Sequence, residues 1–394
     1  MPVGRFMPFF CWLCVSCLLM TACSREPSTS RVSGEVRMRL PFPDDKGEVR
    51  LQEILLSGVE NLLEMRGAYA RFYFAPKLEP GGLRGEAARA RFLRNHDGVY
   101  VPGDFVSQQM GALYAHFEKL SALDREVGAG QVVPWPRSVG VSVRLLKDDG
   151  ALWTDNSFYD GASDAVLVVA TTRRELPLSL NPGVIAHEHF HALFYHLVLR
   201  DLLRDGLVAQ SMAGTAHDDP GLSAPVPDKE IEKKSEELSG NIKLQRALFL
   251  KAANEGLADV WGWIYSGQTD FVGRSLPPFK AARDLGRKGL EPLRSDNFRR
   301  LYGIWKNGGQ NSGAALNNLS YLMGSDLARA VRQAFLDSPA GAKADQDPSR
   351  RKVLARRMIQ RLPELAKRLR ADAELKETGL DLIVELLTAG ESAP

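Results

Sequence analysis

One short segment of the chain carries two histidines and a glutamate at a spacing that suits metal chemistry. His187, Glu188 and His191 form the pattern H-E-x-x-H. On a helix, residues four apart share a face, so both histidines can reach one metal ion while Glu188 handles a water proton there. Two imidazoles suit zinc, and catalytic zinc needs one more protein ligand and an open position for water. His189 lies about 200° around the helix from His187, so we do not expect it to be a ligand.

The surrounding residues favour a metal site over the alternative, a helix whose histidines make only structural hydrogen bonds. The apolar run 165–170 predicts a strand upstream of the motif. Asn181 and Pro182 can supply an N-cap and a first-turn proline, so a capped helix is expected over 181–204. No cysteine follows residue 23, so the body of the protein has no thiol that competes for the metal.

A second acidic pair lies further along the chain, in Ala253-Asn254-Glu255-Gly256-Leu257-Ala258-Asp259-Val260-Trp261. Glu255 and Asp259 are one helical turn apart. Glu255 can bind the metal from a facing helix, while Asp259 accepts the N–H of a metal-bound histidine. Two carboxylates at this spacing alone are typical of a solvated helix face. The apolar residues around them argue instead for burial, namely Leu257, Val260, Trp261 and Ile264.

Hydrophobic patterning divides the chain into an α+β part and a mainly helical part. We expect an α+β domain at 48–204, a polar insertion at 205–240 and a helical domain at 241–394. The first is expected to contain a helix beginning at 48 that leads into a strand at 70–74, a long helix through 106–120, and strands at 139–145 and 165–170. Further helices are expected at 181–204, 241–266, 313–337, 350–371 and 374–389.

The composition excludes several classes of protein. The chain has 394 residues, of which 44% are hydrophobic and 25% charged, and its net charge is +3. These values are typical of a soluble globular protein and exclude collagen-like, disordered and polytopic membrane classes. A charge this close to zero gives no reason to expect nucleic acid as a partner.

The N-terminus has the features of an exported, lipid-anchored protein. All four cysteines lie in the first 23 residues, and an apolar run from Phe6 to Met20 predicts a secretory signal. Its end, Leu19-Met20-Thr21-Ala22-Cys23, resembles the lipobox of bacterial lipoproteins, which implies cleavage after Ala22 and a lipid on Cys23. The alternative is a signal peptide that happens to end at a free cysteine. We expect residues 1–22 to be the signal and 23–47 to be a tether, placing the protein in the cell envelope.

The metal motif and the acidic segment together resemble the signature of the gluzincins, and the chain is similar to thermolysin-family metallopeptidases. The residues that carry this resemblance are His187-Glu188-x-x-His191 followed by Asn254-Glu255-x-x-x-Asp259. It implies one Zn²⁺ per chain, bound by His187, His191 and Glu255. It also implies a thermolysin-like fold, with a mixed sheet-and-helix N-terminal domain, a mainly α-helical C-terminal domain and the zinc site in the cleft.

Three further segments are similar to motifs of the same family and occur in its order. They are Asn156-Ser157-Phe158-Tyr159-Asp160-Gly161, Leu293-Arg294-Ser295, and Asn307-Gly308-Gly309-Gln310-Asn311-Ser312-Gly313 followed by Tyr321-Leu322. By resemblance, Asn156 and the backbone from Ser157 hold the substrate peptide on an edge strand, which is the β-addition mode of recognition. Arg294 corresponds to the arginine that binds the substrate carbonyl beyond the scissile bond.

The chain departs from the family's pattern in four respects. The interval between His191 and Glu255 is longer, because it contains the polar insertion. The stretch 245–249 lacks the tyrosine that the family places a few turns before its glutamate ligand. The segment 307–313 has lost two residues, and no histidine follows His217. Acid-rich calcium sites are not recognisable, so calcium is not predicted.

These observations predict a membrane-anchored zinc endopeptidase that acts on a peptide or protein substrate, with Glu188 as the general base. The main alternative is a peptidase-like lipoprotein that binds peptides but cuts them slowly or not at all. Retention of Glu188 favours the enzyme, because a binding protein has no need of a general base. An exported zinc aminopeptidase is less well supported, since no acidic cluster is placed to bind a free amino terminus.

Overall fold

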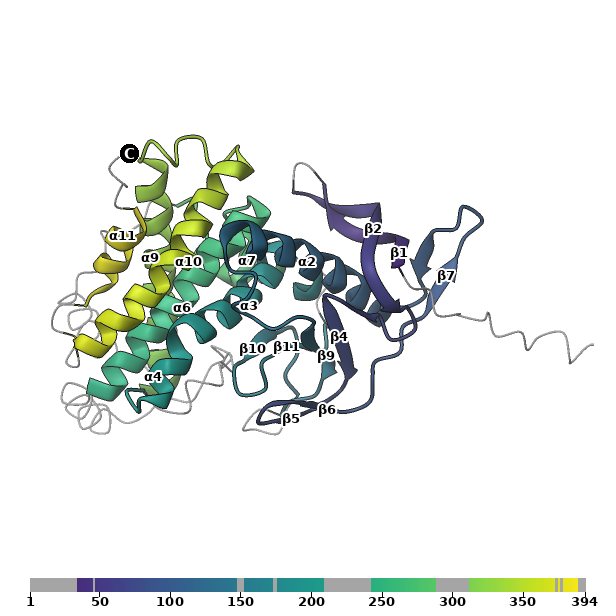
Figure 1. Ribbon diagram of the computed structural model, residues 1–394, viewed down its shortest axis with the longest axis horizontal. Coiled ribbons are helices and arrows are strands. Elements are labelled where there is room, and N and C mark those ends of the chain that lie inside the picture. Colours follow the sequence, from purple (N-terminus) through teal and green to yellow (C-terminus); the bar gives the residue numbers. More distant parts are fainter. Residues whose placement is uncertain are drawn as a thin grey trace, which may run out of the picture.

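The computed structural model has an α+β fold, with its strands before residue 170 in the described part of the chain and a group of helices after residue 180 (Figure 1). The structure describes residues 34–44, 47–146, 152–172, 176–208, 242–287, 312–372, 375 and 378–388. Within these ranges, none of the helices combines the length and apolar character needed to cross a bilayer.

The first sheet has five strands in the order β3-β2-β1-β8-β7. Its strands are β1 (Gly34–Pro43), β2 (Val49–Asn61), β3 (Arg66–Gly67), β7 (Phe92–Arg94) and β8 (Tyr100–Pro102). β1 and β2 form a long antiparallel pair. Two predictions are wrong here, because residues 34–43 were expected in the tether and a helix was expected to begin at residue 48.

The physical reason for both errors is pairing between the two segments. Val36, Met38, Leu40 and Phe42 of β1 are buried and alternate as a strand with one covered face requires, and Pro41 near the end of the strand is buried as well. The leucines and isoleucine of β2 match a helical period equally well, so local spacing alone does not decide its structure. The neighbouring β1 supplies the hydrogen-bonding partner that makes β2 a strand.

The second sheet has four strands in the order β10-β11-β9-β4. These are β4 (Ala70–Phe74), β9 (Arg137–Val143), β10 (Ser157–Asp160) and β11 (Ala165–Val169), which confirms the strands predicted at 70–74, 139–145 and 165–170. β10 is an edge strand that runs antiparallel to β11. A small hairpin of β5 (Lys77–Glu79) and β6 (Gly82–Arg84) stands apart from both sheets.

Helix α2 (Phe105–Val127) covers the inner face of the first sheet. Asp104 caps its start by accepting a hydrogen bond from the Ser107 N–H, and Gly128 ends it in a left-handed conformation with φ of 88°. Gly111 allows close packing, since a Cβ there would lie 2.8 Å from a methyl of Leu40. The helix predicted through 106–120 is thus confirmed, and it fits tightly against β1.

The remaining helices form the second part of the molecule, and the five helical segments predicted after residue 180 are confirmed with shifted ends. They are α3 (Pro182–Phe194), the π-helix η2 (Tyr195–Leu199), α4 (Arg200–Arg204), α6 (Ile242–Ser266), α7 (Phe271–Ser275), α9 (Ser312–Leu336), α10 (Pro348–Ala371) and α11 (Leu380–Thr388), with 3-10 turns η1 (Leu178–Leu180) and η4 (Pro277–Phe279). α3 packs against α6, and α6 packs against α9.

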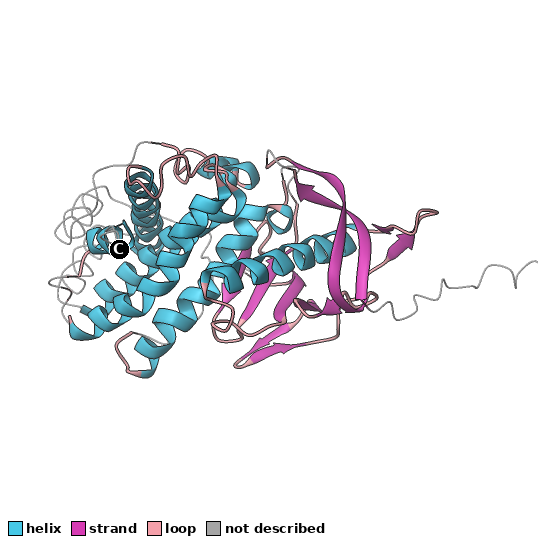
Figure 2. Cartoon of the chain, turned by 45° about the horizontal axis from the view of Figure 1, so that its top comes forward, coloured by secondary structure: helices cyan, strands magenta, loops and turns pink. Residues whose placement is uncertain are grey.

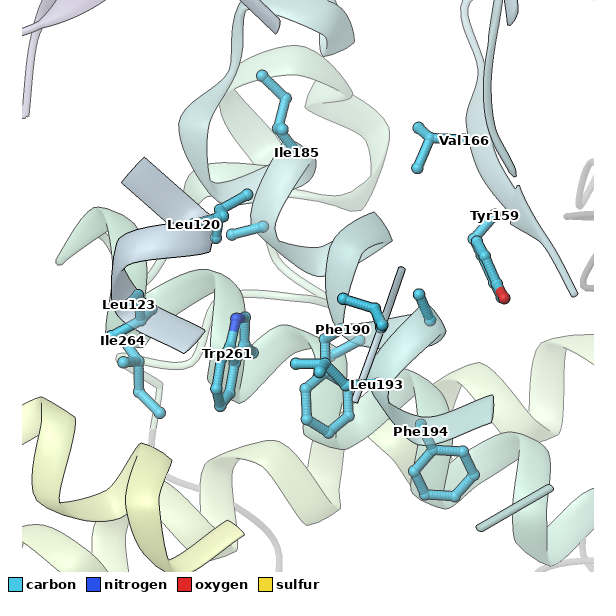
Figure 3. Packing of buried hydrophobic residues seen from close by; sticks show 14 of the residues in the cluster. Leu120, Leu123, Tyr159, Val166, Ile185, Phe190, Leu193, Phe194, Trp261 and Ile264 are labelled. Carbon is cyan, nitrogen blue, oxygen red and sulfur yellow. The ribbon is translucent and has the colours of Figure 1, made fainter. Parts of the chain in front are cut away.

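An apolar core joins α2, α3 and α6 behind the metal motif. Figure 3 shows Leu120 and Leu123 of α2 together with Phe190 of α3 and Trp261 of α6. The rings of Phe190 and Trp261 lie 5.4 Å apart, and both residues are fully buried. Because protein interiors are close-packed, this contact fixes how α3 and α6 face each other.

Candidate metal centre

The start of α3 is fixed by the predicted cap. Asn181 Oδ1 accepts hydrogen bonds from the backbone N–H groups of Gly183 and Val184. Its amide nitrogen donates to the Phe271 carbonyl at 2.7 Å and to Ser275 Oγ at 2.8 Å. The fully buried Asn181 side chain therefore both caps α3 and ties it to α7.

Three potential ligand atoms converge between α3 and α6. One atom each from His187, His191 and Glu255 lies within 4.8 Å of the others. Nε2 of His187 is 3.0 Å from Nε2 of His191 and 3.5 Å from Oε2 of Glu255, while Nε2 of His191 is 3.8 Å from Oε1 of Glu255. Two ligand atoms on one tetrahedral zinc ion are about 3.4 Å apart. The two Glu255 distances are to different oxygens of its carboxylate, and all three distances are close to that value, so the group could hold a zinc ion.

The other nitrogen of each histidine ring points to a polar partner. Nδ1 of His187 lies 3.0 Å from Oδ1 of Asp259, and Nδ1 of His191 lies 3.0 Å from Oδ1 of Asn254. Both partners can accept a hydrogen bond, which places the proton on Nδ1 and leaves the Nε2 lone pair for a metal. The structure thus puts Asp259 against His187, and it adds Asn254 as the partner of His191.

Arg283, which the sequence analysis did not identify, completes this cluster. Its Nη2 lies 2.6 Å from Oδ1 of Asp259, its Nε donates to Oδ2 at 3.1 Å, and Nη2 is 3.6 Å from Oε2 of Glu255. The Arg283 side chain is only 13% exposed. A buried, two-pronged contact of this kind holds a carboxylate in a fixed plane. No motif surrounds Arg283 in the sequence, so no local signal could have found it.

The charged groups of the cluster shift the pKa values of His187 and Asp259. Burial disfavours charge on His187, but its hydrogen bonds to Asp259 and Glu255 outweigh burial and raise its pKa to about 9 in the metal-free protein. Burial likewise disfavours ionised Asp259, yet the charge of Arg283 prevails and lowers the pKa of Asp259. A pKa of about 9 favours the protonated form of His187 at neutral pH, and a metal ion bound there would have to displace that proton.

The two other residues of the motif, Glu188 and His189, occupy different surroundings. Glu188 is buried on α3, next to His187 in sequence. His189 is fully buried on the opposite side of the helix, where its Nε2 lies 2.9 Å from Oδ2 of Asp124 in α2. The ring of Trp135 lies 5.6 Å from the His189 ring. His189 thus connects α3 to α2 and lies outside the ligand cluster.

The predicted substrate-binding residues are only partly within the described chain. Asn156 immediately precedes β10, and its Oδ1 accepts a hydrogen bond from the Ser157 N–H at 2.8 Å. Ser157 is the first residue of that edge strand, which contacts α3. Arg294, residues 307–311 of the last motif, Cys23 and residues 209–240 of the insertion lie outside the described residues. The edge strand β10 therefore lies against α3, the helix that carries His187 and His191. The position of Arg294 relative to them is not described.

Tyr321, from the last motif, lies beside the metal cluster. Its ring centroid is 5.7 Å from Cζ of Arg283 and 5.4 Å from Nζ of Lys251. Lys251 is one helical turn before Glu255 on α6. A cation close to an aromatic ring is a favourable arrangement, so these contacts join Tyr321 of α9 to the same site.

Comparisons with models of known protein families and with curated proteins found no match for this chain.

Proposed function

We propose that the protein is a membrane-anchored, zinc-dependent endopeptidase with a thermolysin-like arrangement of its two parts. The observation that carries this proposal is the convergence of His187, His191 and Glu255, with Asn254 and Asp259 behind the histidines. A helix with only structural histidines has no reason to bury a carboxylate and two imidazole nitrogens around one point.

Each residue of the site has a role in this proposal. A zinc ion bound by the cluster supplies a polarised water and a Lewis acid for the substrate carbonyl. Glu188 removes a proton from the attacking water and delivers it to the leaving amine. Asp259 and Arg283 hold His187 in its tautomer and orientation. A substrate peptide adds to the outer edge of β10, which pairs on one side only among the described strands, where Asn156 and Ser157 position it, and Arg294 contacts a substrate carbonyl.

The chain lacks the tyrosine and the histidine of the family pattern. This loss is expected to slow peptide hydrolysis without abolishing it. Loss of one donor to a developing oxyanion typically costs about 10²- to 10³-fold in rate. Glu188, the proposed general base, is present next to His187 on α3. We therefore propose that the protein is an active peptidase. The alternative, a peptide-binding lipoprotein with a retained metal cluster, forecasts peptide affinity without cleavage.

Metal analysis and hydrolysis measured on one preparation test the proposal. The mature protein should hold about one zinc per chain and cut peptides in a mixed library, and a chelator should stop the cleavage. Glu188→Gln should keep zinc but lose several orders of magnitude in hydrolysis, because Glu188 is not a ligand. His191→Ala should lose the metal, whereas His189→Ala should keep it. A wild type that binds peptides yet cuts none contradicts the proposal and supports the alternative.

A further inference from the structure

The paired strands β1 and β2 have one buried face and one open face. The buried side chains of β1, such as Met38 and Leu40, lie under α2 and are fully covered. On β2, Leu51 and Leu55 remain 70% and 54% exposed. Figure 2 shows this sheet at the end of the molecule, with α2 running away from it towards the other helices. The open face is therefore the outer surface of that end.

The strand register shows which side chains share the open face. Residues directly opposite each other in an antiparallel pair project to the same side. Leu51 is opposite Pro41, Glu53 is opposite Arg39, and Leu55 is opposite Arg37. Pro41 is itself buried, so we call the five exposed residues Arg37, Arg39, Leu51, Glu53 and Leu55 the outer face. It consists of two exposed leucines and a glutamate on one strand beside two arginines on the next.

The polar groups of the outer face are arranged around its leucines. Arg39 and Glu53 form an ion pair of 2.7 Å between Leu51 and Leu55. Arg37 donates to the Asp97 carbonyl at 2.8 Å and remains exposed. Leu93, which is 65% exposed, adds a further apolar side chain on β7 in the same sheet. Leucines interleaved with arginines are suited to the boundary between lipid headgroups and acyl chains.

The position of the expected anchor identifies the partner of this face. Cys23 precedes Gly34, the first residue of β1, by 34 − 23 = 11 residues. Eleven residues span at most about 40 Å even when fully extended. A lipid on Cys23 would therefore keep β1 within that distance of the bilayer. Arg37 and Arg39 would meet the headgroups of anionic lipids, which attract basic residues near the surface.

We propose that the outer face rests on the surface of an anionic membrane. The proposal depends on the lipid anchor at Cys23, and it does not depend on peptidase activity. Contact through this face directs the remainder of the molecule, including α3 and α6 with the metal cluster, away from the lipid (Figure 1). The membrane contact thereby sets the orientation of the site as well as its location.

A fluorescent label on single cysteines tests this contact in the full-length lipidated protein. The native cysteines all lie within residues 1–23, so once the signal is removed and Cys23 is acylated an introduced cysteine is the only free thiol. Leu51→Cys and Leu55→Cys carry an environment-sensitive dye. Leu322→Cys is the matched control, because Leu322 of α9 is 53% exposed, almost as exposed as Leu55. Proteins are reconstituted on phosphatidylethanolamine–phosphatidylglycerol vesicles.

The expected result is a shift of emission to shorter wavelength at positions 51 and 55 and none at 322. Arg37→Gln combined with Arg39→Gln should reduce the shift on these vesicles. Equal emission at all three positions overturns the proposal. A shift that occurs without vesicles and grows with protein concentration assigns the face to a second copy of the chain and also overturns it. If the mature protein has no added mass at Cys23, the lipid anchor does not form and this proposal is wrong. That outcome does not depend on whether the protein hydrolyses peptides.

Discussion

Arg283 balances the negative charges around the proposed metal ligands. Glu255 and Asp259 are buried carboxylates one turn apart, and Arg283 contacts both of them. Without this cation, two buried negative charges would face each other across the site. Since a buried charge without a partner is strongly unfavourable, the arginine is expected to matter for folding as well as for metal binding.

We therefore predict that Arg283→Ala lowers the free energy of unfolding by about 3–5 kcal/mol. It should also weaken zinc binding by about 10- to 100-fold, because Asp259 no longer holds His187 in place. Arg283→Lys keeps the charge but loses the two-pronged contact, so an intermediate effect is expected. Denaturant unfolding and zinc competition measure both quantities. Wild-type zinc affinity in a folded Arg283→Ala protein would contradict this role.

The raised pKa of His187 makes the stability of the metal-free protein depend on pH. An imidazole in the unfolded chain has a pKa of about 6.5, whereas that of His187 is raised to about 9. The native state binds the proton more tightly, so the stabilisation is complete below about pH 6.5 and is lost as the pH rises towards 9. Chelated wild type should lose stability over this interval more steeply than His187→Gln. Parallel pH profiles of the two proteins would show that His187 does not carry the effect.

At the level of helices, glycines set the distance between α6 and α9. A Cβ on Gly256 would collide with the carbonyl oxygen of Gly324, and a Cβ on Gly324 would lie 2.9 Å from the Ala252 carbonyl oxygen. Gly256 directly follows Glu255, so any separation of the two helices would displace this proposed metal ligand. The crossing of α6 and α9 thus positions Glu255.

Gly256→Ala is accordingly predicted to lower the free energy of unfolding by about 1–3 kcal/mol and to weaken zinc binding. Gly82→Ala is the control, because a Cβ at Gly82 meets no atom within 4 Å. Thermal unfolding and zinc titration compare the two variants. Unchanged zinc affinity in Gly256→Ala would mean that the ligand cluster tolerates movement of α6.

The sequence predicted those elements whose pattern is local. Helices such as α3 and α6 carry a 3.6-residue period, and Asn181 marks the start of α3. β2 could not be predicted in the same way, because its strand state depends on pairing with β1. Arg283 was missed for a related reason. It follows η4 in an irregular segment and reaches Asp259 only through the tertiary fold.

At the scale of the whole molecule, the proposed anchor precedes the first sheet in the chain, whereas the proposed site belongs to the helical part. β1 begins 11 residues after Cys23, whereas the ligand cluster belongs to α3 and α6 (Figure 1). Attachment and chemistry should therefore be separable by mutation. A change at Cys23 is expected to alter where the protein is found without altering its metal content.

Cys23→Ser tests this separation. A serine has no thiol to acylate, so the variant should gain no lipid, remain uncut after Ala22 and lose its firm attachment to the membrane, since a stable anchor requires acyl chains. Its zinc content should equal that of the wild type. Cys17→Ser is the matched control, because Cys17 lies in the expected signal and its loss should leave processing intact. Mass spectrometry of the N-terminal peptide, membrane fractionation and metal analysis give the three readouts. Normal cleavage of the wild type with no mass added at Cys23 would contradict the anchor, and a loss of zinc in Cys23→Ser would contradict the independence of the anchor and the metal site.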